Sequence, residues 1–346
     1  MLMKRDITLR SRAVLISLAL GLPLSTLFLW LAFRTANLDE VWSVVREAEL
    51  GLLMLAVVAI GGVYATQATR WHAIARTPEL PTTRFAEMVV SGVAVNNVLP
   101  GRVGDLLRAR WLQVAGRIPA GRSLATVLVD RAFDVFALVV FLAFSLPFVS
   151  SAEWLRRIVV GSLVLLVAVA LALVVARVYT RRLARNRRVG RGLFRRILRD
   201  TLEGLADPID RTRAIALTGV SLGVWALWGV AAWLVARAVG IELSPVDAIF
   251  VTAVINLGVA IPSSPGFIGT FQWLAVSALT LFDVATEQAL AFAVLMHAVW
   301  YVPTTLVGAG LLLRRTFGRV APPKRQADPV RGFNVESGHS AADERA

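Results

Sequence analysis

The sequence predicts an all-α polytopic membrane protein. Of its 346 residues, 57% are hydrophobic and 17% are charged, and the mean hydropathy is +0.67, a composition far more apolar than that of a water-soluble domain. Apolar runs near the length of about 20 residues that a transmembrane helix needs recur along the chain. Two further apolar segments are broken by Pro-Gly pairs. We therefore predict six full transmembrane helices and two broken segments that enter the bilayer and return.

Each of the six predicted spans is an apolar run long enough to cross the hydrocarbon core. The first is long and has no small-residue cleavage site after it, so it is expected to remain as a helix. The predicted spans are residues 13–33, 50–69, 123–147, 158–178, 214–235 and 289–313.

Basic residues set the expected orientation, because cytoplasmic loops carry an excess of lysine and arginine. The N-terminus (1–12), the loop 179–213 and the tail 314–346 are basic and are assigned to the cytoplasm, with the tail predicted to be disordered. Residues 34–49 hold more acids than bases and are assigned to the outside. The expected location of the membrane domain, residues 13–313, is the cytoplasmic membrane of a prokaryote.

Arginines also fill the stretch from Arg70 to Arg122, which assigns that whole stretch to the cytoplasmic side. The short apolar segment within it, 86–115, must then enter from the cytoplasm and return. The second broken segment, 248–282, must enter from the outer side if the last span is to end in the cytoplasm. Short segments interrupted by proline and glycine are typical of re-entrant helices, whose freed backbone is covered by protein or water.

The two broken segments share the pattern P-G-x-[VI]-G, at residues 100–104 and 265–269. Because the spans that flank them run in opposite directions, this pattern predicts an inverted-topology repeat with a substrate site where the broken helices meet. The residues assigned to the breaks are Pro100, Gly101, Gly104, Pro262, Pro265, Gly266 and Gly269, and they are preceded by Asn96, Asn97 and Asn256.

Charged residues within the predicted span 123–147 are the next candidates for function. Asp130 and Asp134 lie one helical turn apart, with Arg131 on a different face. An ionised group at the bilayer centre costs roughly 2.5–3.5 kcal/mol, so these side chains must face other helices or water. Two interpretations stay open: the aspartates neutralise nearby arginines in a structural cluster, or one arginine keeps donors free for a phosphate oxygen.

The candidate site residues fall into two groups. His297 is expected to be hydrogen-bonded between helices, with a proton relay or a headgroup contact as the alternative. The tryptophans expected to be interfacial anchors or packing residues are Trp225, Trp228, Trp233 and Trp300. The candidates for binding a lipid phosphate or headgroup are Arg102, Arg108, Arg131, Asn96, Asn97 and Asn256, and those for charge pairing or coupling are Asp105, Asp130, Asp134 and His297.

Several function classes are disfavoured by what the sequence lacks. It contains no cysteine, no zinc-ligand spacing and no GxSxG, Walker A or GxGxxG motif, so no metal, cofactor or enzymatic activity is expected. The net charge of +14 comes mostly from arginines between the apolar runs, where they meet anionic headgroups. Membrane phospholipids, and not nucleic acid, are therefore the expected partners.

Three signatures occur in order along the chain. They are Asn97-x-x-Pro100-Gly101-Arg102-x-Gly104-Asp105-x-x-Arg108, then Asp130-Arg131-x-x-Asp134, then Pro262-x-x-Pro265-Gly266-x-Ile268-Gly269-Thr270-x-Gln272. Together they resemble the lysylphosphatidylglycerol synthase transmembrane family, also called the flippase-like or UPF0104 membrane domain. The resemblance extends over the region from residue 13 to residue 313.

This resemblance implies a lipid-handling membrane domain. In multi-domain members the domain is associated with moving a modified phospholipid to the outer leaflet, while a separate soluble domain makes that lipid. Residues 314–346 alone follow the last predicted span, so a stand-alone membrane domain is expected. Asp105 and Gln272 stand where the family commonly has glutamate, and the missing acid at Gln272 weakens any specificity for a lysyl headgroup, which carboxylates would attract.

The predicted function is to bind a phospholipid or another phosphate-bearing lipid and to translocate it between leaflets through a polar cleft. Two alternatives stay open. One is a secondary transporter for a small solute or ion, and the other is a membrane scaffold for a separately encoded lipid-modifying enzyme or glycosyltransferase.

Overall fold

The computed structural model describes residues 23–100, 102–149, 193–206, 210–259 and 265–317, together with residues 161 and 164. Within these ranges every regular element is a helix, as the sequence predicts. The helices are α2 (Leu38–Glu47), α3 (Leu50–Ala75), α4 (Thr82–Val98), α5 (Val103–Ala115), α6 (Ala120–Ser145), α8 (Leu193–Ala206), α9 (Arg211–Ala238), α10 (Pro245–Gly258), α11 (Thr270–Leu279) and α12 (Thr286–Phe317). Shorter elements are the apolar helix Pro23–Phe33 and the 3-10 turns η1 (Leu146–Phe148), η2 (Pro265–Phe267) and η3 (Thr280–Phe282).

Four helical segments in the described ranges are long and apolar enough to cross a bilayer. They are α3, α9, the segment Pro265–Phe282 and, in α12, Thr286–Arg315. Helix α6 has the same length as α3 but contains the charged side chains of Asp130, Arg131 and Asp134. The predicted span 158–178 lies outside the described residues and the span 13–33 lies only partly within them, so the count of six spans stays a prediction.

Other expectations also fall on residues that the structure does not describe. These are the break residues Gly101 and Pro262, the N-terminus (1–12) and residues 318–346 of the predicted tail. The first residues of that tail, 314–317, form the end of α12.

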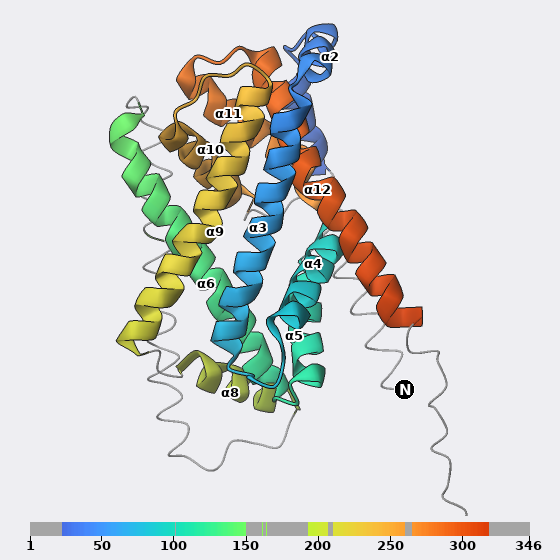
Figure 1. Ribbon diagram of the computed structural model, residues 1–346, viewed down its shortest axis with the longest axis vertical. Coiled ribbons are helices and arrows are strands. Elements are labelled where there is room, and N and C mark those ends of the chain that lie inside the picture. Colours follow the sequence, from blue (N-terminus) through green and yellow to red (C-terminus); the bar gives the residue numbers. More distant parts are fainter. Residues whose placement is uncertain are drawn as a thin grey trace, which may run out of the picture.

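The two broken segments form helix pairs at opposite ends of the molecule (Figure 1). Helices α3 and α9 lie side by side along its length, and α6 and α12 flank them. The pair α4 and α5 occupies the lower half of the view, next to the end that carries α8. The pair α10 and α11 occupies the upper half, next to the end that carries α2. Each pair therefore reverses direction inside the bundle.

The first helix of the pair α10–α11 begins at residues that favour a helix N-terminus. A capping box begins α10: the Asp247 backbone N–H donates to Ser244 Oγ at 3.2 Å, and the Ser244 N–H donates to the Asp247 carboxylate at 3.0 Å. Pro245 occupies the first helical position, where its missing N–H leaves no hydrogen bond unmade. These residues determine where along the chain α10 begins.

Both breaks use the same unusual backbone conformation. Arg102 (φ 54°) precedes α5 and Phe267 (φ 60°) leads into α11, and each is the third residue of the P-G-x-[VI]-G pattern. A left-handed conformation costs a residue with a side chain about 1–2 kcal/mol, so the surrounding contacts must hold both residues in place.

The first turn of α5 lies directly against α4. A Cβ atom added to Gly104 would be 1.9 Å from the carbonyl oxygen of Gly92, so only glycine fits there. The Gly104 N–H also donates to Asn96 Oδ1 at 2.7 Å. The glycine and the asparagine together make α4 and α5 a tight helical hairpin.

Candidate functional site

Alternating arginines and aspartates form a closed ring of ion pairs at the centre of the bundle, here called the charge ring. Each aspartate contacts two arginines and each arginine contacts two aspartates. The ring runs from Arg70 to Asp134, Arg131, Asp105, Arg108, Asp130 and back to Arg70, with N···O distances of 2.7, 3.0, 2.8, 3.6, 3.0 and 2.9 Å. Its formal charge is zero.

Three helices supply the charge ring. Arg70 comes from α3, Asp105 and Arg108 come from α5, and the remaining members come from α6. Asp130 and Asp134 lie one turn apart on α6, so both carboxylates reach the Arg70 guanidinium. The ring therefore fixes α3, α5 and α6 to one another.

Aromatic and polar groups of α3 and α9 make further contacts with the charge ring. The Arg108 guanidinium lies over the Trp71 ring at 4.2 Å. From α9, Ser221 accepts a hydrogen bond from Arg70 at 3.1 Å, and Trp225 Nε1 donates to Asp134 at 3.1 Å. Arg70, Arg108 and Asp130 have no exposed side-chain surface. Buried charges need such partners, because the desolvation cost otherwise exceeds the attraction between them.

A cavity of about 210 Å³ lies beside the ring and is bounded by two different walls. One wall comes from α3 to α6 and carries Gln67, Asn96, Asn97, Arg102, Asp105, Arg131 and Asp134. The other comes from α9 to α12 and, apart from Asn256, is apolar or aromatic, with Trp225, Trp228, Phe267, Phe271 and Trp300 among its residues. The cavity therefore offers charged and amide groups on one side and aromatic rings on the other.

Arg102 lies in this cavity but outside the charge ring. Its side chain is exposed, its Nη2 donates to the Val259 carbonyl at 3.3 Å, and its guanidinium carbon lies 6.0 Å from the centroid of the Phe267 ring. Among the described residues Arg102 has no carboxylate within ion-pair distance. It is the one cavity arginine in the described lining whose charge the ring does not neutralise.

The three predicted asparagines all line the cavity, and each side chain also makes a hydrogen bond within the protein. Asn96 accepts from the Gly104 N–H at the start of α5. The Asn97 side chain donates to Thr305 at 2.8 Å, and its carbonyl accepts from the Tyr301 hydroxyl at 3.2 Å, which joins α4 to α12. Asn256 donates to the Thr252 carbonyl at 2.9 Å within α10.

His297 lies on α12 in a buried aromatic layer, away from the lining of the cavity. Its Nδ1 is 2.8 Å from the side-chain nitrogen of Gln272, and its ring stacks on Trp300 with 5.1 Å between centroids. Gln272 in turn accepts from the Gly269 N–H at 2.7 Å. His297 therefore makes the predicted hydrogen bond between helices, and it braces the second break against α12.

The predicted candidates thus separate into two places. Arg108 and Asp130 lie in the buried part of the charge ring and do not line the cavity. Arg102, Asp105, Arg131, Asp134 and the three asparagines do line it. The breaks at Pro100, Gly104, Pro265, Gly266 and Gly269 place the helix ends around it.

One expectation needs correction. The charge pattern of the sequence assigns Arg70 to a basic cytoplasmic stretch, but it lies inside α3 and is fully buried in the charge ring. The neighbouring Trp71, Ala73 and Ala75 are the signal that the helix continues past it. Of the tryptophans expected as anchors or packing residues, Trp225 and Trp300 are buried in the hydrophobic core and Trp228 packs against it. These three also line the cavity.

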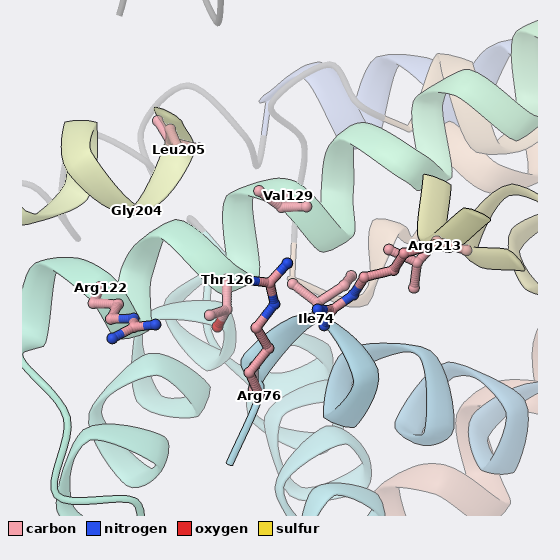
Figure 2. A pocket seen from close by; sticks show the side chains of 10 residues that line it. Ile74, Arg76, Arg122, Thr126, Val129, Gly204, Leu205 and Arg213 are labelled. Carbon is pink, nitrogen blue, oxygen red and sulfur yellow. The ribbon is translucent and has the colours of Figure 1, made fainter. Parts of the chain in front are cut away.

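A second, smaller cavity of about 50 Å³ lies toward α8, and three arginine side chains surround it (Figure 2). They are Arg76 at the end of α3, Arg122 in α6 and Arg213 in α9. In the described ranges no group of His, Asp and Glu side chains is arranged to hold a metal ion.

Comparison with known proteins identifies the family. Residues 14–308 match the model of the lysylphosphatidylglycerol synthase TM region. The glycosyltransferase AglD of Haloferax volcanii is 26% identical over 343 residues, covering 86% of this chain and 54% of AglD, so this chain spans about half the length of that relative. A UPF0104 membrane protein of Methanocaldococcus jannaschii is 23% identical over 219 residues, covering 62% of this chain and 91% of that protein. The chain is an integral membrane protein that belongs to the family of the lysylphosphatidylglycerol synthase TM region.

Proposed function

We propose that this protein binds a phosphate-bearing lipid in the central cavity and moves it between the two leaflets. The observation that carries the proposal is the position of Arg102. It is exposed in the cavity and lies outside the charge ring, so its guanidinium keeps N–H donors for another anion. A guanidinium matches the geometry of a phosphate through parallel hydrogen bonds.

Charge balance favours an anion at this site. The charge ring is neutral, and Arg102 adds one positive charge beside it. A lipid phosphodiester carries one negative charge and would neutralise Arg102 without disturbing the ring. A free inorganic ion would neutralise it too, but the aromatic wall gives an apolar surface that suits a lipid.

The arrangement of the helix pairs supports a path across the membrane. A headgroup must cross a hydrocarbon core of about 30 Å, where unsatisfied polar groups cost several kcal/mol each. The pairs α4–α5 and α10–α11 reverse inside the bundle from opposite ends, and both contribute to the cavity. We propose that they are re-entrant elements of an inverted repeat and that each governs access from one leaflet. Transport of this kind needs no covalent chemistry.

The distribution of charges supports the proposed orientation. The acidic helix α2 lies at the upper end in Figure 1, whereas Arg76, Arg122 and Arg213 lie around the cavity toward α8, at the lower end. The end of α12, with Arg314 and Arg315, points to the lower end as well. By the positive-inside rule we propose that the lower end, with the end of α12, faces the cytoplasm.

A reconstitution experiment tests the proposal. Purified protein is placed in liposomes that contain a fluorescent phospholipid, and translocation is measured as the fraction of label that a membrane-impermeant quencher reaches. Arg102→Ala should slow translocation roughly tenfold or more, because a hydrogen bond to a charged group contributes about 1.5–3 kcal/mol. Arg110→Ala is the matched control, since Arg110 is exposed on the same helix and does not line the cavity. Equal rates for wild type, Arg102→Ala and protein-free liposomes would overturn the proposal.

The relation to AglD favours a second candidate. Because a glycosyltransferase shares similarity with most of this chain, the membrane domain is also a candidate scaffold for a separately encoded glycosyltransferase. In that case Arg102→Ala would leave function intact, whereas changes on the exposed face of α8 would abolish copurification of the enzyme.

A further inference from the structure

The cavity also indicates what kind of headgroup it takes. We infer that the ligand is a phosphodiester lipid with one negative charge and an uncharged, hydroxyl-bearing headgroup, such as a glycerol or a sugar, and not an amine-bearing one. This inference rests on the proposed function, because it assumes that Arg102 contacts the lipid phosphate.

The described lining of the cavity offers no free carboxylate to a cationic headgroup. Its acidic residues are Asp105 and Asp134, and both belong to the charge ring. Arg131 contacts Asp105 through two nitrogens, at 2.8 and 3.2 Å, and Asp134 through a third at 3.0 Å. An ammonium group entering the cavity would have to compete with Arg131 for these oxygens. It would also be repelled by Arg102.

An unpartnered amide lies in the charged wall. Gln67 on α3 is 7% exposed and lines the cavity, and its side chain has no hydrogen-bond partner among the described residues. An amide that lines a cavity offers a ligand donors and an acceptor together. A hydroxyl, which also donates and accepts, is a matching ligand, whereas a quaternary ammonium can satisfy neither role.

The aromatic wall of the cavity suits a polyol or a sugar. Trp225, Trp228 and Trp300 line this side, with 6.3 Å between the ring centroids of Trp225 and Trp228 and of Trp228 and Trp300. Aromatic faces attract cations as well as the C–H surface of a polyol or sugar. Charge balance decides between the two: a phosphodiester with an uncharged headgroup neutralises Arg102, whereas an additional cation on the headgroup would leave the cavity with one surplus positive charge.

Binding to mixed lipids tests this inference directly. Wild-type protein in detergent is offered an equimolar mixture of phosphatidylglycerol, a glucosyl phosphoprenol, phosphatidylmethanol, phosphatidylethanolamine, phosphatidylcholine and lysylphosphatidylglycerol, and the bound lipids are identified by native mass spectrometry. We expect phosphatidylglycerol or the glucosyl lipid to be bound about tenfold above the amine-bearing lipids. Which of the two dominates distinguishes a glycerol from a sugar headgroup. Phosphatidylmethanol has the same charge but no hydroxyl, so it isolates the contribution of Gln67.

Two variants sharpen the test. Gln67→Leu should remove the preference for phosphatidylglycerol over phosphatidylmethanol and leave binding of both intact. Arg131→Gln and Arg102→Gln each remove one positive charge, but only the first frees the carboxylates of Asp105 and Asp134. Arg131→Gln should therefore increase binding of lysylphosphatidylglycerol relative to phosphatidylglycerol, and Arg102→Gln should not.

The outcomes separate the two proposals. If no lipid is retained above the level of an Arg102→Ala sample, the proposed function fails. If wild type binds phosphatidylethanolamine or lysylphosphatidylglycerol as well as phosphatidylglycerol, the function stands and the assignment of the headgroup is overturned. Equal binding of phosphatidylmethanol and phosphatidylglycerol by wild type would overturn the role of the hydroxyl. None of these outcomes requires a variant in the charge ring, so they can be read even if such a variant fails to fold.

Discussion

Arg102 and Phe267 occupy the same position in the two Pro-Gly motifs, and they contact each other across the cavity. The guanidinium carbon lies 6.0 Å from the centroid of the phenyl ring, and the φ angles of the two residues are 54° and 60°. The motifs therefore share a backbone conformation as well as letters. Because one residue is a cation and the other an aromatic ring, the meeting point of the two helix pairs is also the boundary between the charged and the aromatic wall.

The charge ring predicts a large stability cost for Asp130→Asn. Asp130 is shared by Arg70 and Arg108, which are both fully buried, and breaking a buried pair costs about 3–5 kcal/mol because it leaves uncompensated charge. The free energy of unfolding in mixed micelles, followed by circular dichroism, measures this loss. Glu203→Gln is the control: its pair with Arg199 is exposed and is expected to contribute less than about 1 kcal/mol. Similar unfolding midpoints for the two variants would contradict a closed ring of ion pairs.

The hairpin of α4 and α5 predicts that Gly104→Ala destabilises the protein. The added methyl group would meet the backbone of α4 and not a flexible side chain, so the loss should reach or exceed the roughly 1–3 kcal/mol that overpacking costs. Gly61→Ala in α3 has no heavy atom within 4 Å of its new Cβ and should be neutral or stabilising, because alanine is the better helix former. Thermal unfolding in detergent compares the two, and equal midpoints would show that α5 and α4 are not in backbone contact.

The left-handed conformation of Arg102 predicts that Arg102→Gly abolishes lipid binding without lowering the stability of the fold. Arg102→Gly removes backbone strain from the folded state, which stabilises it by about 1–2 kcal/mol. Glycine also gives the unfolded chain more conformational freedom, which lowers the free energy of unfolding by about 0.4–1 kcal/mol. The variant should therefore unfold at or above the wild-type denaturant concentration, yet retain no phosphate-bearing lipid through purification. A clear loss of stability would indicate that Arg102 serves the fold and not the ligand.

The proposed re-entry of the helix pairs predicts where single cysteines react, in a chain that has no native cysteine. Exposed positions flank both pairs: Thr83 and Ala115 flank α4–α5, and Glu242 and Ala285 flank α10–α11. Cysteines at the first two should react with a membrane-impermeant maleimide from the cytoplasmic side, and those at the other two from the outside. Labelling of the two ends of one pair from opposite sides would mean that the pair crosses the bilayer.

Local signals in the sequence are enough to predict the helical class and both breaks. Pro100 and Pro265, with the glycines that follow, mark helix ends regardless of the rest of the fold. The one-turn spacing of Asp130 and Asp134 likewise places two carboxylates on one face of a helix, because that relation depends on helix geometry alone.

The remainder of the site depends on contacts between distant segments. Arg70 looks like one more basic residue near a cytoplasmic loop, and only the approach of α3 to α5 and α6 reveals that it closes the charge ring. The difference between Arg102 and Arg108 is similar: both follow the same break, but one faces the cavity and the other a tryptophan of α3. Residue spacing within α5 cannot assign a partner to either.

The two walls of the cavity come from different parts of the chain and differ in charge. Each formal charge in the described lining comes from α5 and α6 or the break before them, and the segments from α9 to α12 add rings and one amide. Under the proposed function, a lipid bound here would place its phosphate toward α5, α6 and the break before them. The two breaks thus share a left-handed residue at the same motif position but present different chemistry to the cavity, a guanidinium from Arg102 and an aromatic ring from Phe267.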